Sequence, residues 1–228
     1  MSDEVRRVFS RISPHYDLMN HLMSMGVDKG WRRTAAEDIL AGNPSSILDI
    51  ATGTGDLALE ISRLAASSGR KIGIVGMDFS EEMLCLARKK AAAAGIDDTV
   101  FEYGDALKLK YANGSFDAVT SAFAIRNFDD LGMFAKELSR VLRKGGRFVL
   151  LDMANPESNA GRLFFSVYSR VMLAMGFVAS RHAYTRLVRT IREFDPEKLS
   201  SALKEEGLAD IRTRRLVSGI AFITTGRK

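Results

Sequence analysis

The chain has 228 residues, of which 46% are hydrophobic and 27% charged, a composition typical of a globular protein rather than of a disordered or fibrous one. No apolar run approaches the roughly 20 residues that a bilayer-crossing helix needs, and residues 1–9 are charged, unlike a signal peptide. One cysteine, Cys85, and three scattered histidines exclude a disulfide framework and argue against a metal site. We therefore expect a soluble, cytoplasmic protein that holds no metal.

The charge is distributed unevenly along the chain. Residues 1–135 contain 15 Lys and Arg against 19 Asp and Glu, a net charge of −4, whereas residues 136–228 contain 18 against 9, a net charge of +9. This asymmetry suggests that the C-terminal part meets an anionic partner, such as nucleic acid, an acidic substrate or a membrane surface. A basic face that contacts only water is an equally good interpretation.

Residues 1–42 have the periodicity of helices, and residues 43–152 alternate between short apolar runs and amphipathic segments. N-terminal helices are predicted over Asp3–Ile12, Pro14–Met25 and Val27–Leu40. Strands are predicted over Ser46–Ile50, Lys71–Met77, Thr99–Glu102, Asp117–Ala122 and Arg147–Asp152. Helices between them are predicted over Asp56–Ala66, from the capping residue Ser80 onward, and over Asp130–Leu142 with its end at Lys144–Gly146. This alternation predicts a doubly wound, mainly parallel sheet.

After Pro156 the pattern is helical again, over Gly161–Met175, Tyr184–Arg192 and Pro196–Glu206. Two final strands, Ala209–Val217 and Gly219–Thr225, are predicted to form an antiparallel hairpin that completes a seven-stranded sheet. We therefore expect a single α/β domain over residues 1–228. In it, residues 1–42 form a lid, 43–152 a cofactor-binding core, and 153–228 the substrate-side helices and the closing hairpin.

The strongest chemical motif is the glycine-rich turn Leu48–Asp56, which lies between the first predicted strand and its helix. Glycines at such a turn let a ligand approach the backbone, and the helix N-terminus offers unpaired N–H groups. Gly53 and Gly55 also fit a dinucleotide-binding fingerprint. Asp49, however, would repel a pyrophosphate, whereas it suits a ligand that carries an ammonium and a sulfonium.

Two further acids follow the next two strands. Asp78 lies 25 residues after Gly53, where a carboxylate can accept hydrogen bonds from both hydroxyls of an adenosine ribose. Asp105, after the third strand, is placed to accept from an adenine amino group. Each acid alone is equally compatible with a helix cap or a surface residue, and Asp78 serves NAD as well. Three acids at successive strand ends favour S-adenosylmethionine over NAD.

The Leu48–Asp56 turn, with Asp78 and Asp105, is similar to the motifs of class I methyltransferases. Three more segments, Val8–Asn20, Trp31-Arg32 and Ala122–Asn127, resemble the ubiquinone/menaquinone biosynthesis C-methyltransferase family, and the similarity extends from about residue 5 to the C-terminus. The departures are Ala124 for the usual glycine, Lys144 for proline, Asp152–Pro156 for a glutamate-led segment, and a loose match over Ala183–Leu187.

The resemblance implies a Rossmann-like, S-adenosylmethionine-dependent enzyme that methylates a ring carbon of a reduced, prenylated quinone precursor. The ring, demethylmenaquinol-like or ubiquinol-precursor-like, is left open, and so is the choice between a monomer and a homodimer. The residues that the resemblance and the strand ends place at the cofactor are Asp49, Gly53, Thr54, Gly55, Asp78, Phe79, Asp105, Ala106 and Ala122.

Methyl transfer from a sulfonium proceeds by in-line displacement, so the protein must mainly hold the reacting carbon in place and exclude water. The carbon becomes nucleophilic when the neighbouring hydroxyl loses its proton, which a base and a cation near the phenolate assist. We expect Arg126 to stabilise the phenolate and Asn127 to orient the substrate or a water. The alternative is that Arg126 pairs with a nearby acid such as Asp129.

The predicted lid contributes two further candidates, Tyr16 as a contact for substrate or cofactor and Asp17 as a proton acceptor. Core packing of Tyr16 and support of a helical turn by Asp17 are equally good interpretations, and His15 is a weaker candidate for the base.

The most lipophilic stretch, Leu163–Phe177, is flanked by Arg162, Arg170 and Arg181. Core packing is the first interpretation, but peripheral contact with an anionic membrane also fits and would let a prenyl tail enter. Rival functions are an RNA methyltransferase, an NAD-dependent oxidoreductase and a non-catalytic cofactor-binding protein. Nucleic acid is a disfavoured partner, because no aromatic-interleaved basic patch is present.

Overall fold

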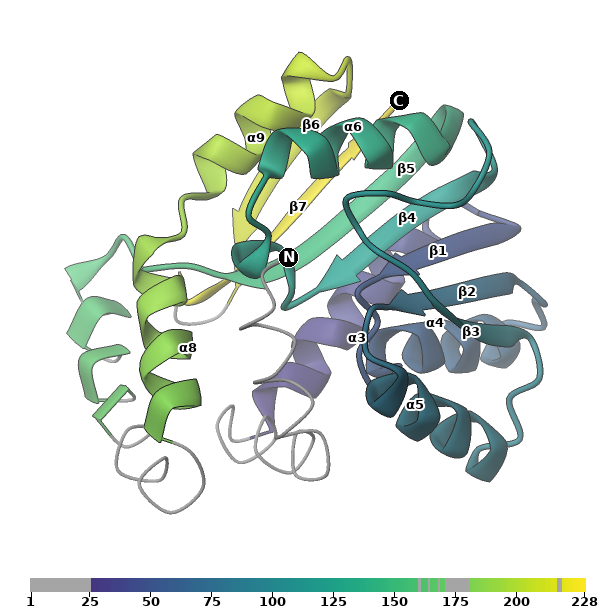
Figure 1. The fold of residues 1–228 in the computed structure, drawn as a ribbon, viewed down its shortest axis with the longest axis horizontal. Helices are drawn as coiled ribbons and strands as arrows, with labels where there is room; N and C mark the ends of the chain where they lie inside the picture. Colours follow the sequence, from purple (N-terminus) through teal and green to yellow (C-terminus); the bar gives the residue numbers. More distant parts are fainter. Residues whose placement is uncertain (1–25, 160, 164, 168, 171–180, 217–218) are drawn as a thin grey trace.

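The computed structural model describes residues 26–159, 161–163, 165–167, 169–170, 181–216 and 219–228, and in this part of the chain seven strands form one sheet (Figure 1). The strands are β1 (Ser46–Ile50), β2 (Gly73–Asp78), β3 (Thr99–Tyr103), β4 (Phe116–Ala122), β5 (Leu142–Met153), β6 (Ala209–Arg215) and β7 (Ala221–Arg227). The helices are α3 (Val27–Leu40), α4 (Asp56–Ser67), α5 (Glu81–Ala93), the 3-10 turn η2 (Ile125–Asn127), α6 (Leu131–Val141), α8 (Arg181–Glu193) and α9 (Pro196–Glu205).

The strand order is β3-β2-β1-β4-β5-β7-β6. Strands β1 to β5 pair in parallel, while β7 pairs antiparallel with both β5 and β6. The predicted doubly wound sheet with a closing antiparallel hairpin is therefore confirmed. Ser218, at the predicted hairpin turn, and the predicted helices before residue 26 lie outside the described residues.

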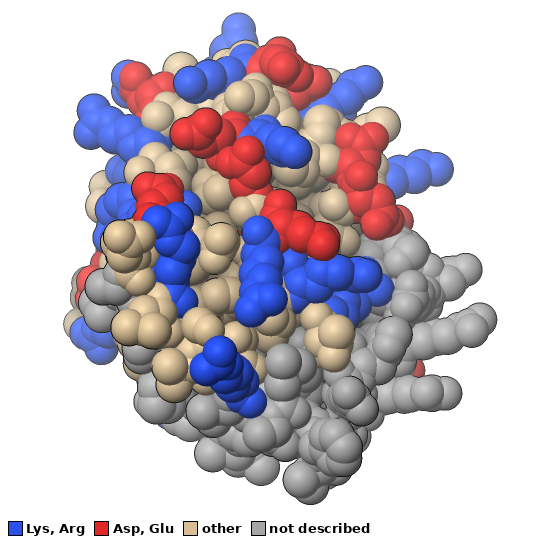
Figure 2. Space-filling model, turned by 90° about the vertical axis from the view of Figure 1, so that its left-hand side faces the viewer, with Lys and Arg blue, Asp and Glu red and all other residues tan. Residues whose placement is uncertain are grey.

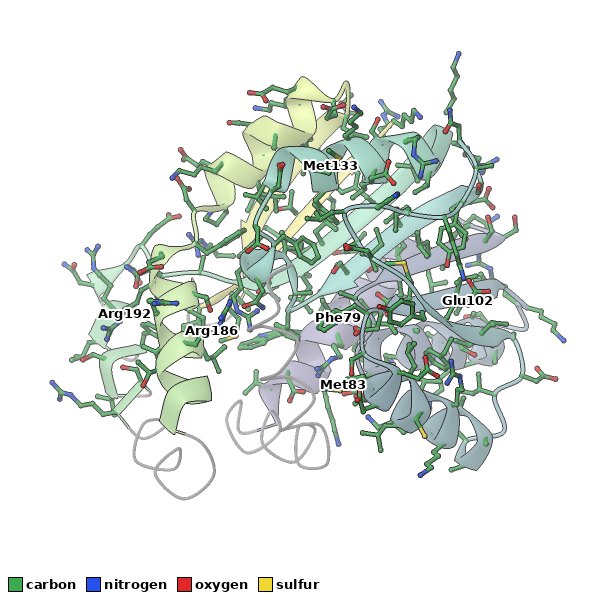
Figure 3. All side chains as sticks on the ribbon, viewed as in Figure 1. Phe79, Met83, Glu102, Met133, Arg186 and Arg192 are labelled. Atoms are coloured by element: carbon green, nitrogen blue, oxygen red, sulfur yellow. The ribbon has the colours of Figure 1, made fainter. Side chains whose placement is uncertain are left out.

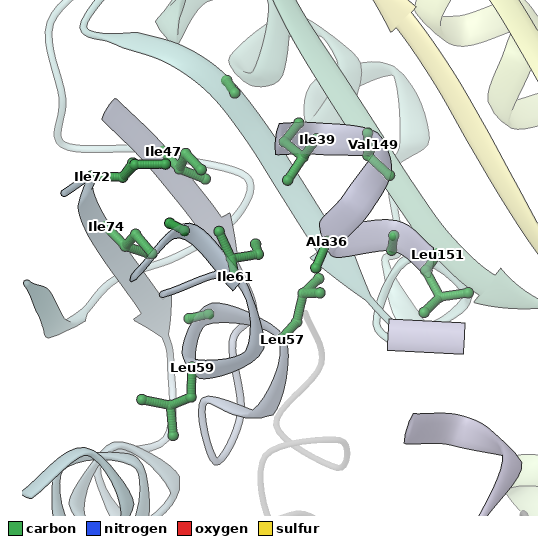
Figure 4. Packing of buried hydrophobic residues seen from close by; sticks show 14 of the residues in the cluster. Ala36, Ile39, Ile47, Leu57, Leu59, Ile61, Ile72, Ile74, Val149 and Leu151 are labelled. Carbon is green, nitrogen blue, oxygen red and sulfur yellow. The ribbon is translucent and has the colours of Figure 1, made fainter. Parts of the chain in front are cut away.

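Helices cover both faces of the sheet, which explains why the strands are apolar on both sides. One core packs α3, α4 and α5 against the sheet and includes Ile39, Ile47 and Val149 (Figure 4). The other core, on the opposite face, packs α6 and α9 and includes Leu48 and Phe134. Ile47 and Leu48, neighbours on β1, enter different cores because successive strand residues point to opposite faces.

The predicted helix over Asp130–Leu142 agrees with α6 to within one residue at each end, but the interpretation of Lys144–Gly146 as its C-terminus is wrong, because these residues belong to β5. Asp130 is the N-cap of α6, as expected, but α6 ends at Val141, because Leu142 has an extended backbone (φ −75°, ψ 131°) and begins β5. Burial of the Leu142 side chain in the second core fixes this earlier end.

The glycines of this segment serve the strand rather than a helix terminus. The Gly145 N–H donates to the Lys228 carbonyl at 2.7 Å, and the Lys228 N–H donates to the Gly146 carbonyl at 3.0 Å. A Cβ on Gly146 would lie 2.8 Å from the Asp117 carbonyl oxygen, so only glycine fits this approach of two strands.

The C-terminal helices pack together beside the sheet. The described residues of the predicted Gly161–Met175 helix are helical through 170, and Phe165 packs with Val188, Ile191 and Ile220 in a small third core. Helix α8 begins at Arg181, three residues before the predicted start. Among the described residues, no helix has both the length and the apolar character required to cross a membrane.

Candidate active site

The site lies at the carboxyl ends of β1, β2 and β4, where the strand order reverses between β1 and β4. In open α/β sheets ligands bind in the crevice outside such a reversal, because the loops from neighbouring strands turn away in opposite directions. The turn after β1, the Asp78 end of β2 and the residues after β4 meet here, as the registers of these strands require.

The glycine turn after β1 has a left-handed backbone at three positions, with φ of 55° at Ala51, 57° at Gly53 and 82° at Gly55. A Cβ built on Gly53 has no described heavy atom within 4 Å, so this position is open toward the crevice. Gly55 is needed for a different reason, since its Cβ would lie 2.8 Å from the Phe101 ring, and the same ring leaves only 2.7 Å at Gly76.

Asp49 is almost fully buried at the end of β1. Its Oδ2 accepts a hydrogen bond from the Thr52 hydroxyl at 2.6 Å, while its buried Oδ1 has no hydrogen-bond partner among the described residues. Burial raises the pKa of Asp49 to about 7, the nearby Asp78 carboxylate adds to the rise, and Thr52 and Arg32 oppose it. An unpartnered buried carboxylate oxygen is costly, and a bound cationic donor would satisfy it.

Asp78, at the end of β2, holds the glycine turn in place. Its Oδ2 accepts from the Gly53 N–H at 2.8 Å and its Oδ1 from the Ser80 N–H at 2.9 Å. Burial raises the pKa of Asp78 to about 6, against the lowering effect of these backbone hydrogen bonds. Ser80 caps α5 through a hydrogen bond from the Met83 N–H, as predicted.

Two adjoining hollows share Ala51, Gly53, Ala122 and Phe123. The first hollow is lined by these four residues and by Asp78, Phe79, Met83, Ala124, Asn127 and Phe128. The second hollow is lined by the same four and by Arg32, Asp49, Thr52, Thr54, Asp56 and Leu57. Figure 3 shows Phe79 and Met83 at the start of α5, beside the carboxyl ends of the strands. One end of the crevice is thus aromatic and apolar, and the other carries charged groups.

Most of the predicted cofactor residues meet in this crevice: Asp49, Gly53, Thr54, Asp78, Phe79 and Ala122. Gly55 lies behind the turn against Phe101. Asp105 and Ala106 line neither hollow; the Asp105 side chain accepts from the Leu107 N–H at 2.9 Å and so shapes its own loop.

Arg32 is a site residue that the sequence did not single out for a role. It is buried on α3, forms an ion pair with Asp28, lies 3.7 Å from Asp56, and has its guanidinium carbon 5.0 Å from the centre of the Phe123 ring. This places a cation in the second hollow close to Asp49. The available signal was the Trp31-Arg32 pair, which carried part of the family resemblance without indicating which ligand the arginine meets.

Asn127 and Arg126 occupy η2, directly after β4, but they face different surroundings. Asn127 lines the first hollow, whereas the Arg126 side chain is buried and pairs with Asp152 at the end of β5. The alternative that Arg126 pairs with an acid is thus realised, and the acid is Asp152. Tyr16 and Asp17, like His15, lie outside the described residues.

These features fit S-adenosylmethionine. The unpartnered Asp49 oxygen suits an ammonium, the Arg32 guanidinium a carboxylate, and the open space at Gly53 lets a ligand lie against the backbone. The acid at the turn opposes the pyrophosphate of a dinucleotide. A doubly wound sheet ending in an antiparallel hairpin, with this crevice at its switch point, defines a class I methyltransferase.

Residues 1–228 match the model of the ubiE/COQ5 methyltransferase family, and the chain belongs to that family. It is 43% identical to a demethylmenaquinone methyltransferase of Deinococcus radiodurans, covering 98% of this chain and 92% of the relative. It is 39% identical to a ubiquinone/menaquinone biosynthesis C-methyltransferase of Geobacter sulfurreducens, covering 99% of this chain and 89% of the relative.

Solved structures confirm the fold. A SAM-dependent methyltransferase of Thermotoga maritima superposes with a TM-score of 0.67 at 20% identity, covering 97% of this chain and 98% of that one. The family match confirms the predicted methyltransferase with S-adenosylmethionine as its methyl donor, and the solved structure confirms the fold alone.

Proposed function

We propose that the chain methylates a ring carbon of a reduced, prenylated quinone precursor, with demethylmenaquinol as the preferred substrate. The full-length match to the family carries this proposal, since the Deinococcus relative is named for demethylmenaquinone. The apolar lining of the first hollow, with Phe79, Phe123 and Phe128, suits a flat aromatic ring.

The direct test is transfer of a radiolabelled methyl group to short-tailed demethylmenaquinol and, in parallel, to a ubiquinol precursor, both chemically reduced. Faster labelling of demethylmenaquinol supports the proposal, and labelling of the ubiquinol precursor alone would overturn the choice of ring. Absence of transfer to both would overturn the function.

At the cofactor, we assign each residue by its chemistry. Asp49 accepts from the ammonium, Arg32 donates to the carboxylate, and Asp78 accepts from the ribose hydroxyls. Phe79 lies against the adenine, and Asp105 accepts from the adenine amino group. When bound, S-adenosylmethionine supplies an electrophilic methyl group on its sulfonium. Ala122 and the backbone of Gly53, Thr54 and Gly55 would hold the cofactor in the crevice, while Ala106 supports the loop of Asp105.

On the substrate side, the protein lowers the barrier by orientation and by electrostatics. Asn127 lines the hollow and orients the ring hydroxyl or a water. Arg126, one residue earlier, supplies positive charge that favours the phenolate over the phenol. We also propose Asp17 as the acceptor of the hydroxyl proton and Tyr16 as a contact for the ring, both of which lie outside the described residues. Helix α3 packs in the same core as α4 and α5, so we assign residues 27–40 to the cofactor-binding core rather than to a lid, and residues 153–228 to the substrate side of the same domain.

We also propose that the enzyme works in the cytoplasm at an anionic membrane surface. Leu163 and Val167, one helical turn apart, are 69% and 53% exposed, and Arg162 and Arg170 flank them. Arg189 and Arg192 on α8 are also exposed, and Figure 2 shows Lys and Arg side chains across the middle of this face, with Asp and Glu side chains among those in its upper half. A lipid surface would supply both the quinol tail and the anionic headgroups.

Co-sedimentation with vesicles tests this contact. Binding should be stronger to vesicles containing anionic lipid than to purely zwitterionic ones, and salt should weaken it, because exposed charges are screened. Equal binding to both compositions would contradict it. Light scattering of the protein in solution would decide whether it acts as a homodimer, which the substrate proposal does not require.

A further inference from the structure

Asp152 is a buried carboxylate at the end of β5 to which neither the sequence motifs nor the roles above assign a function. Its Oδ2 accepts from the Arg126 backbone N–H at 3.0 Å, and its Oδ1 accepts from the Met153 N–H at 2.7 Å and from Arg126 Nη1. One acid therefore holds both the backbone and the side chain of Arg126.

The Arg126 guanidinium is oriented through a single nitrogen. Nη1 donates to Asp152 and, at 2.8 Å, to the Phe123 carbonyl, whereas the buried Nε finds no hydrogen-bond partner in the described part of the chain. The side chain is only 6% exposed. A planar group held at one corner by two acceptors has little freedom to turn, so Asp152 determines which way the remaining N–H groups face.

The same contacts shape the wall of the first hollow. Ala124 and Asn127, on either side of Arg126, both line it. Phe123 has a left-handed backbone (φ 60°), which is rare for an aromatic residue and persists only where neighbouring contacts hold it. Its N–H donates to the Leu151 carbonyl at 2.8 Å, immediately before Asp152. The end of β5 thus fixes the turn that carries Asn127.

Stability alone does not explain this ion pair. Taking two charges out of water costs as much as their attraction returns, and well-packed apolar pairs of similar size are often as stable or more stable. A charged pair of this kind gives a defined geometry that an apolar pair does not.

We propose that Asp152 is a positioning residue, which acts through Arg126 to aim the guanidinium and to place Asn127 at the quinol ring. The inference rests on the proposed function for the substrate, and on the two contacts of Asp152 with Arg126 for the geometry. Asp152 itself touches neither cofactor nor substrate in this assignment.

The decisive experiment is a double-mutant cycle of Arg126→Met, Asp152→Asn and the double variant, in single-turnover transfer of radiolabelled methyl to short-tailed demethylmenaquinol. Asp152→Asn should slow transfer about 100-fold in the wild-type background, the cost of a misplaced catalytic group. In the Arg126→Met background it should change the rate less than about twofold, because the guanidinium is gone and an asparagine oxygen can still accept from the backbone N–H of residue 126. Equal losses in both backgrounds would overturn the proposal.

Three further measurements separate positioning from general damage. Cofactor affinity by calorimetry should stay within about threefold of wild type in Asp152→Asn, because neither Asp152 nor Arg126 is assigned a contact with the cofactor. Asp152→Glu, which keeps the charge, should restore at least about a tenth of the wild-type rate, and failure of this rescue together with intact folding would contradict the proposal. If Asp152→Asn alone does not fold, Asp152→Glu and the neutral double variant still test the proposal, since neither buries an unpaired charge. Asp152→Glu, which keeps the ion pair, should transfer the methyl group faster than the double variant, and equal rates would overturn the proposal.

A readout independent of turnover distinguishes failure of this inference from failure of the proposed function. The Arg126 Nε–H resonance, assigned by its loss in Arg126→Lys, should exchange with water at least about tenfold faster in Asp152→Asn. If the wild-type enzyme transfers no methyl group but Asp152→Asn still shows the faster exchange, the quinol substrate is overturned while the Arg126–Asp152 geometry stands. An unchanged exchange rate would overturn the positioning role itself.

Discussion

The acidic crevice and the basic C-terminal face use charge in opposite ways. Asp49 and Asp78 are buried, so their pKa values are raised and their charge depends on pH and on a bound ligand. Arg162, Arg170 and Arg189 are exposed, so water solvates their charges and salt screens them. The buried acids near the cofactor site can therefore change their protonation when a cation binds, whereas the exposed arginines provide only electrostatic attraction for an anionic partner.

The largest effect should come from removing the unpartnered acid. Asp49→Asn should weaken S-adenosylmethionine binding about 100-fold, because a charged hydrogen bond to the ammonium is lost and the amide presents a donor instead. Calorimetric titration measures it. The control is Asp97→Asn, at an acid 88% exposed in a surface ion pair, which should bind normally. Equal affinity in the two variants would show that Asp49 does not meet the ammonium.

Cofactor binding should depend on pH in a defined direction. A cationic ligand needs ionised Asp49, whose pKa is about 7 in the free protein, so affinity should rise with pH and level off above about 7. From pH 7 down to pH 6 the loss should be about fivefold, because the ionised fraction of Asp49 falls from about one half to about one tenth, and binding should release protons to the buffer. Titrations in buffers of different ionisation enthalpy would detect the protons. In Asp49→Asn fewer protons should be released on cofactor binding, and those that remain should come from Asp78.

Burial of Asp49 also lowers the free energy of unfolding of the ligand-free protein. Its folded-state pKa is raised from 3.8 to about 7, so it destabilises the ligand-free protein progressively as pH rises through that interval. Asp49→Asn should therefore increase the free energy of unfolding at pH 8 by up to about 4 kcal/mol, and by almost nothing below about pH 4. Urea unfolding at the two pH values is the measurement. A gain that does not depend on pH would contradict the assigned cause.

The smallest effect is expected on the basic face. Arg162→Glu with Arg170→Glu should weaken binding to anionic vesicles by about 1 kcal/mol per arginine removed, with further loss from the added acids. The matched control, Arg63→Glu with Lys71→Glu, reverses two exposed charges elsewhere and should bind as wild type does. Equal losses in the two double variants would show that net charge, rather than this face, governs the contact.

The sheet was predictable because each strand of the core is a short apolar run followed by a turn residue, as in Ser46–Ile50, whose bounds agree with the structure. The start of β5, at Leu142 rather than at the predicted Arg147, was not predictable, because Lys144–Gly146 is compatible both with a helix terminus and with a strand. The choice depends on contacts with Lys228 and Asp117, which lie far away in the sequence.

The candidate site was likewise predictable from the sequence only in part. Asp49, Gly53 and Asp78 belong to strand ends whose meeting follows from parallel topology, so their proximity could be expected. Arg32 and Asp152 could not be placed from the sequence. Arg32 lies on α3 and Asp152 on β5, and only the tertiary packing of these elements brings the two residues to the site. Arg126 was recognised as important, but its partner is the acid 26 positions later on the neighbouring strand, not an acid of its own loop.

The Phe101 ring has a wider consequence for how this crevice tolerates change. The Phe101 ring fills the space that a Cβ would need at both Gly55 and Gly76. Neither glycine can therefore be replaced while Phe101 keeps its ring. Trimming the ring would free space at two glycines on separate segments at once. Gly55, the motif glycine nearest α4, is therefore constrained by Phe101 on the edge strand β3. The shape of the cofactor loop thus depends on a residue to which no ligand contact is assigned.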